Sequence, residues 1–128
     1  MPQIVVLVVG HDPLLLKTQG QVLQAAGYIV VSTHSLKEAM AKFLQGDFDL
    51  VILCHSLHLE ERERLTYLIR EQTALTPIIS ISPNLGQHDL FTDVTLNNDP
   101  NELVTGLREV LNGHGEYFSG DGSTGRAA

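Results

Sequence analysis

The sequence predicts an α/β fold in which helices cover both faces of a parallel sheet of five strands. The first observation is a series of short runs rich in β-branched and other apolar residues, which are typical of buried strands. The second is that these runs alternate with longer stretches whose apolar residues recur at helical spacing. Because parallel strands need helical crossovers, this repeated alternation favours a doubly wound parallel sheet over an antiparallel one.

The first unit is a strand, a polar turn and a helix. Residues 4–9 read IVVLVV and stop at Gly10, and a run that is apolar on both faces suits a central strand. Asp12 is a good N-cap residue and Pro13 suits the first turn of a helix. The helix is expected to end at Gly27, since glycine is favoured just beyond a helix C-terminus.

The later elements follow the same pattern. Ser35 can cap a second helix, because Glu38 stands at the capping-box spacing, and Gly46 is expected to end it. The charged run over residues 60–64 predicts a solvated helix start. The remaining predicted elements are strands over residues 28–33, 48–54, 78–82 and 93–96, a helix over residues 60–71, and a last helix that opens at residues 99–100.

Two segments depart from the alternation. Only ten residues separate Ser82 from Asp93, and Pro83 and Gly86 lie among them, so no complete helix is expected there. Residues 113–128 hold five glycines and show no periodicity, which predicts a disordered tail or the start of a linker. One domain is therefore expected over residues 1–112.

Composition restricts the class of protein. The chain has 128 residues, of which 43% are hydrophobic, and a net charge of −7, which argues against nucleic acid or an anionic membrane as a partner. A single cysteine excludes an intrachain disulfide. The longest apolar stretch near the start is too short for a membrane span and has no charged leader, so a cytoplasmic protein is expected.

Five segments, in order, resemble the receiver domain of bacterial response regulators. The resemblance covers about residues 3–112. It implies a flavodoxin-like three-layer sandwich and a role in two-component phosphorelay signal transduction. The short segment after Ser82 implies that the fourth helix of the family is shortened or missing in this chain. The segments are IVVLVVGHDPLLL, LQAAGYIVVSTHSLKEAM, GDFDLVILC, TPIISIS and DPNELVTGLREVLN.

The family's phosphotransfer residues are mostly absent. Receiver domains accept a phosphoryl group on an Asp of their own at the end of the third strand. They bind Mg²⁺ through that Asp and an acidic pair after the first strand. The resemblance places Cys54 at the acceptor position, and Gly10 and His11 at the acidic pair. Mg²⁺ requires hard oxygen ligands, which these residues do not supply.

Three further positions complete the degenerate pocket that the resemblance implies. Asp12 is the third residue of the turn, and Ser82 retains the hydroxyl that contacts phosphate in the family. The family's lysine is replaced by Leu96 or Asn97, depending on a one-residue gap. The pocket is thus predicted to comprise Gly10, His11, Asp12, Cys54, Ser82 and Asn97.

These substitutions predict a pseudo-receiver, a non-phosphorylatable regulatory module that binds proteins. It is expected to be no enzyme and to use no cofactor. Its predicted partners are signalling proteins, with self-association left open, and neither nucleic acid nor membrane.

An alternative is a metal- or redox-sensing module that uses His11 and Cys54, with His58 as a third ligand. Imidazole and thiolate suit zinc or copper, and a neighbouring histidine could lower the thiol pKa. Against it, the spacing of Cys54 and His58 matches no known zinc signature. The simpler interpretation is that Cys54 is a packed apolar side chain.

Overall fold

The computed structural model describes residues 3–83 and 89–118, and of residues 113–118 it describes the backbone alone. The chain divides into two compact units, Met1–Asn98 and Asp99–Ala128. In the described residues, the first unit contains five strands and three helices, and the second unit contains the last helix.

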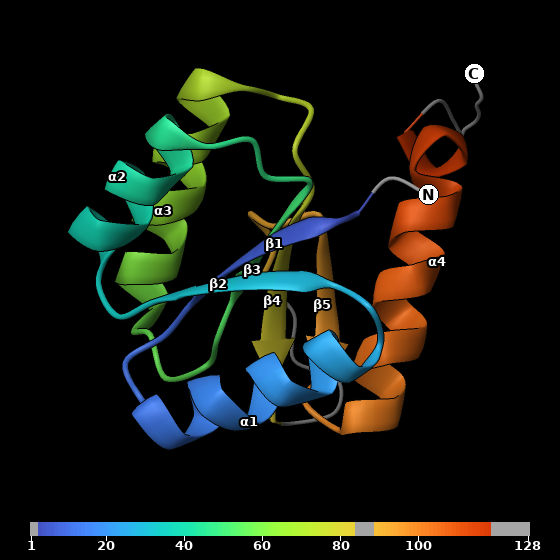
Figure 1. The fold of residues 1–128 in the computed structure, drawn as a ribbon. Coiled ribbons are helices and arrows are strands. Elements are labelled where there is room, and N and C mark those ends of the chain that lie inside the picture. The colour runs from blue at the N-terminus through green and yellow to red at the C-terminus, as the bar shows by residue number, and fades with distance from the viewer. Residues whose placement is uncertain (1–2, 84–88, 119–128) are drawn as a thin grey trace. The chain divides into compact units, whose positions relative to one another are not determined.

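The five strands of the first unit form one sheet in the order β2-β1-β3-β4-β5, and every neighbouring pair is parallel (Figure 1). This confirms the doubly wound parallel sheet. The strands are β1 (Val5–Val9), β2 (Ile29–Thr33), β3 (Leu50–Leu53), β4 (Ile78–Ser82) and β5 (Val94–Asn97). The helices are α1 (Pro13–Ala25), α2 (Leu36–Gln45), α3 (Leu59–Gln72) and, in the second unit, α4 (Pro100–Phe118).

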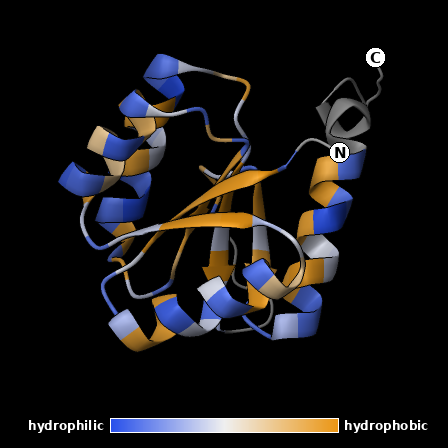
Figure 2. Ribbon diagram, in the orientation of Figure 1, coloured by the Kyte–Doolittle hydropathy of each residue, from blue (hydrophilic) through white to orange (hydrophobic). Residues whose placement is uncertain are grey.

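Helices cover both faces of the sheet, so the first unit has three layers. Helix α1 packs against β1 and β2, while α2 packs against α3 and β1. Figure 2 shows that the central strands are hydrophobic along their length, as expected for strands buried on both faces. Alternate strand residues such as Leu7 and Leu53 are fully buried together with Leu65 and Ile69 of α3. Each such side chain stabilises the fold by about 1.5–3 kcal/mol.

The predicted caps are confirmed. The Asp12 carboxylate accepts hydrogen bonds from the N–H groups of Leu14 and Leu15, and the Ser35 hydroxyl accepts one from Glu38. Glu38 does not complete a standard capping box, because its carboxylate accepts the N–H of His34 at 2.7 Å. Just beyond α1, Gly27 has a φ of 99°, a conformation that favours glycine.

The connection between β4 and β5 is held by α3. No helix forms in residues 89–93, the described part of this segment; residues 84–88 lie outside the described residues. Arg62 makes two hydrogen bonds to the Asp89 carboxylate, at 2.8 and 3.2 Å, and Arg70 pairs with Asp93. The prediction of a solvated helix start is therefore wrong for Arg62, whose side chain is only 15% exposed.

Some predicted boundaries are corrected. Strand β5 begins at Val94, because the Asp93 side chain accepts the N–H of Ile78 and pairs with Arg70 at the strand's edge. The last helix continues to Phe118, so the expected start of the tail at residue 113 falls inside it. Residues 119–128 lie outside the described residues, and their disorder stays a prediction. No helix in the described part of the chain has both the length and the apolar composition needed to cross a bilayer.

Candidate functional site

The predicted pocket residues lie where the central strands end. Parallel strands bring their carboxyl ends to one edge of the sheet, which is where ligands bind in open α/β folds. Strand β1 continues into Gly10 and β3 into Cys54, whose N–H donates to the carbonyl oxygen of Val9 at 2.9 Å. Gly10 and Cys54 are therefore direct neighbours across the centre of this edge.

Cys54 is buried on the α1 side of the sheet. Its side chain has no solvent exposure, and its Sγ donates a hydrogen bond to Gln19 Oε1 at 2.9 Å. Burial, with a smaller contribution from the negative charge of Asp12, raises the pKa of the Cys54 thiol to about 12. The group at the end of β3 is thus a neutral thiol at neutral pH, whereas the thiolate is the form that acts as nucleophile and metal ligand.

The side chains of Cys54 and Ser56 occupy the position that a side chain at residue 10 would take. A Cβ added at Gly10 would lie 2.9 Å from Cys54 Cβ, 2.9 Å from Ser56 Oγ and 3.3 Å from Cys54 Sγ. Contacts below 3.0 Å force one of these atoms to move, so no side chain larger than hydrogen fits without rearrangement. A carboxylate cannot occupy this position while Cys54 and Ser56 stay in place.

Ser56 closes the turn that follows β1. Its hydroxyl oxygen accepts the backbone N–H of His11 at 2.9 Å and that of Asp12 at 3.3 Å. The one acidic side chain of this turn, Asp12, uses its Oδ1 to cap α1. Hydrogen bonds within the chain therefore occupy the backbone donors of the turn and one oxygen of its carboxylate.

His11 connects the turn after β1 with the turn after β2 and with the first turn of α3. Its Nδ1 lies 3.0 Å from the carbonyl oxygen of His34, and its Nε2 lies 2.8 and 3.0 Å from the two carboxylate oxygens of Glu61. Both partners can only accept, so both ring nitrogens donate when the ring is a cation. The backbone N–H of His58 and then the His11 ring hold the pKa of the Glu61 carboxyl below its usual value.

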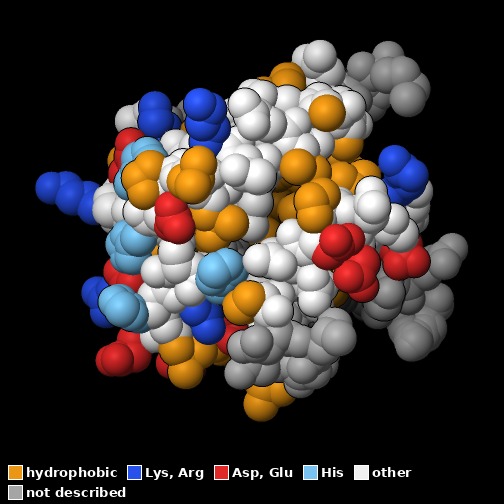
Figure 3. Space-filling view, turned by 90° about the horizontal axis from the view of Figure 1, so that it is seen from below, with side chains coloured by type: hydrophobic (Ala, Val, Ile, Leu, Met, Phe, Trp, Pro, Cys, Tyr) orange, Lys and Arg blue, Asp and Glu red, His pale blue; other side chains and the backbone are white. Residues whose placement is uncertain are grey.

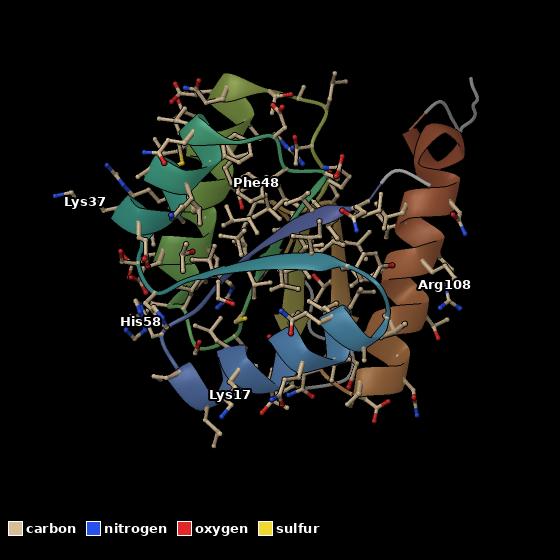
Figure 4. All side chains as sticks on the ribbon, in the orientation of Figure 1. Lys17, Lys37, Phe48, His58 and Arg108 are labelled. Atoms are coloured by element: carbon tan, nitrogen blue, oxygen red, sulfur yellow. The ribbon has the colours of Figure 1, made fainter. Side chains whose placement is uncertain are left out.

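The alternative metal or redox site is not favoured. Histidine side chains do gather on the face seen in Figure 3, and His58 lies at the start of α3 (Figure 4), with its ring centroid 6.3 Å from that of His11. Cys54, however, faces Gln19, whereas His11 faces Glu61. Among the residues that the structure describes, no three His, Cys, Asp or Glu side chains are placed to hold a metal ion.

Ser82 and Asn97 lie together at the ends of β4 and β5. The strand register pairs Asn97 with Ser82, and it pairs Leu96 with Ile81. Asn97 is therefore the residue of β5 beside the Ser82 position. Ser82 also borders a cleft of about 440 Å³ between these strands and the start of α3. Any role for Ser82 and Asn97 in binding stays a prediction.

Three residues that shape this edge are missing from the predicted site. Gln19 could have been noticed, because it is a polar residue on the buried face of α1. Ser56 follows β3 closely and has no distinguishing pattern. Glu61 lies fifty positions from His11, and nothing in either local sequence indicates their pairing.

Comparison with known proteins gives the fold a clear counterpart. No protein-family model matches the chain, and no curated protein sequence does. Among solved structures, the chemotaxis response regulator CheY4 of Vibrio cholerae is similar, with a TM-score of 0.73 and 24% identity over 85% of this chain and 99% of that chain.

Two crystal structures that contain the response regulator TrrA are also similar. The complex of the histidine kinase ThkA with TrrA has a TM-score of 0.75 and 23% identity, over 85% of this chain and 99% of the matched chain. TrrA from Thermotoga maritima with Mg²⁺ and BeF has a TM-score of 0.74 and 24% identity, over 84% and 99% of the two chains. The chain therefore has the flavodoxin-like α/β fold of response regulator receiver domains.

Proposed function

We propose that this chain is a regulatory module of bacterial two-component signalling that binds a protein partner and is not phosphorylated at the receiver position. The observation that carries the proposal is Cys54, which stands at the end of β3 as a buried, neutral thiol hydrogen-bonded to Gln19. The resemblance places the phosphorylated Asp of the family at this position.

The surroundings of Cys54 support the same proposal. A cation that bridges an acceptor and a phosphoryl group needs several oxygen ligands. In this chain the position of one acidic residue is Gly10, with space for no side chain. The other is His11, which is itself paired with Glu61. The site thus lacks both a nucleophile and a place for a dication, so we propose no enzymatic activity and no metal cofactor.

The fold and the net charge both support a protein as the binding partner. One of the similar structures is a complex of a response regulator with a histidine kinase, which supports a protein partner for this chain. The net charge of −7 supports neither nucleic acid nor an anionic membrane surface as the partner. A cytoplasmic location is part of the same proposal, which does not decide between a different protein and a second copy of this chain as the partner.

Acetyl phosphate with Mg²⁺ tests the central claim. The intact mass of the chain, measured by mass spectrometry after incubation, is expected to stay unchanged, while a response regulator that retains its acceptor Asp gains one phosphoryl group in the same reaction. A labile gain of one phosphoryl group on this chain would contradict the proposal.

Cys54→Asp is the informative variant. It restores a carboxylate at the end of β3 but leaves Gly10 and His11 unchanged, so it is also expected to remain unphosphorylated. Phosphorylation of this variant would show that the dication site persists, and the argument from Gly10 and His11 would then be wrong.

A further inference from the structure

The cleft beside Ser82 is separate from the buried thiol. It lies between the start of α3 and the carboxyl ends of β4 and β5, and its volume of about 440 Å³ falls in the range of small-molecule sites, roughly 300–1,000 Å³. An apolar part of its wall is formed by Leu59, Ile81 and Pro83. The polar part is formed by His55, Arg62, Ser82, Asp89 and Thr95.

Among the described residues that line this cleft, the fixed charges cancel each other. Arg62 and Asp89 form a two-bond ion pair, and their side chains are 15% and 13% exposed. Burial opposes ionisation of Asp89, but the Arg62 guanidinium holds the pKa of this carboxyl below its usual value. A charged ligand would lose water in the cleft without gaining an uncompensated opposite charge, so the wall favours an uncharged ligand.

Hydrogen-bonding groups remain available next to this ion pair. The Asp89 carboxylate accepts two hydrogen bonds from Arg62, and the Ser80 hydroxyl also favours its ionised form. The two carboxylate oxygens offer about four lone-pair sites, so at least one remains. The Thr95 hydroxyl accepts the Asp89 N–H at 3.0 Å and still has a proton to donate. An acceptor and a donor are therefore close together on the polar wall, and the apolar side chains of Leu59 and Ile81 line the same cleft.

We infer that this cleft binds an uncharged, flat heterocycle of nucleobase size that presents an N–H group beside a carbonyl. The N–H donates to Asp89, the carbonyl accepts from Thr95, and the ring face lies against the apolar wall. This inference does not depend on the proposed function: Ser82 of the predicted pocket lines the cleft, but Gly10, His11 and Cys54, on which the proposed function rests, do not.

A titration followed by ¹H–¹⁵N NMR on the full chain tests the inference, with uridine as the probe. Uridine at millimolar concentrations is expected to shift the amide signals of His55, Leu59, Ser82 and Thr95. N3-methyluridine, in which the donor is blocked, is expected to bind about tenfold more weakly, since it leaves the carboxylate without its bond. Benzoate, a flat anion, is expected to bind more weakly than uridine.

Two leucine variants distinguish uridine binding in the cleft from non-specific binding elsewhere on the surface. Leu59→Trp fills the cleft from a residue that is 55% exposed, and it is expected to weaken uridine binding at least tenfold. Leu75→Trp makes the same change at a residue that is 79% exposed and does not line the cleft, and it should bind uridine like the parent chain. The inference is overturned if uridine shifts none of these signals, if benzoate binds as well as uridine, or if Leu59→Trp binds like the parent.

Discussion

Gly10→Ala tests the claim that the space beside Gly10 and Cys54 is closed by the chain's own atoms. The new methyl carbon would lie 2.9 Å from Cys54 Cβ and 2.9 Å from Ser56 Oγ, both closer than side-chain carbons approach such atoms. Neither neighbour can move freely, because Cys54 is fully buried and Ser56 accepts two backbone hydrogen bonds. Gly10 has no positive φ, so the effect of the substitution is steric alone.

The expected cost follows from overpacking. Forcing one extra carbon into a close-packed interior costs about 1–3 kcal/mol, and two simultaneous short contacts place this variant near the upper end. We therefore expect the free energy of unfolding to fall by about 2–3 kcal/mol. A loss of that size lowers the melting temperature by roughly 10 °C in a chain of this length.

Gly20→Ala is the matched control, measured by urea denaturation followed by circular dichroism. A Cβ at Gly20 would lie 3.8 Å from Val30 Cγ1, an ordinary contact, inside helix α1. This variant is expected to be stabilised by about 0.5–1 kcal/mol, because alanine is favoured over glycine within helices. If Gly10→Ala unfolds at the same urea concentration as the parent chain, the closed-site argument fails.

Three further predictions concern neighbouring groups. Because the folded pKa of the Cys54 thiol is raised to about 12, its contribution to stability is complete below the ordinary value of 9.0 and is lost as the pH rises above it. In urea denaturation, the free energy of unfolding of the parent chain should fall by about 1.4 kcal/mol more than that of Cys54→Ala between pH 8 and pH 10. Equal losses in the two chains would refute the raised pKa of the thiol. Asp12→Ala should cost about 1 kcal/mol through the lost α1 cap, whereas Asp12→Asn should cost little, since asparagine also caps; thermal unfolding distinguishes them. Asp89→Ala leaves Arg62 mostly buried without its counter-charge and should cost about 2–3 kcal/mol, against less than about 0.5 kcal/mol for Glu63→Ala on the exposed side of α3. Equal denaturation midpoints for these two variants would show that the ion pair does not hold the β4–β5 connection.

Local patterns were sufficient to predict the architecture. The six apolar residues of the first strand, the cap at Asp12 and the repeated strand–helix alternation each depend on neighbouring positions in the chain, and each is confirmed. Parallel pairing then follows, since a helix must return the chain to the same end of the sheet. The sequence likewise shows that Gly10 and Cys54, and no carboxylates, follow the first and third strands.

The state of the site could not be predicted in this way, because it depends on contacts between distant segments. Gln19 meets Cys54 across 35 positions, Ser56 closes the turn at His11 across 45, and Arg62 reaches Asp89 across 27. Periodicity shows which face of a helix is buried, but it does not show which side chain lies opposite. Contacts between distant segments therefore decided that the thiol is fully buried with a raised pKa, and that the space beside Gly10 is already occupied.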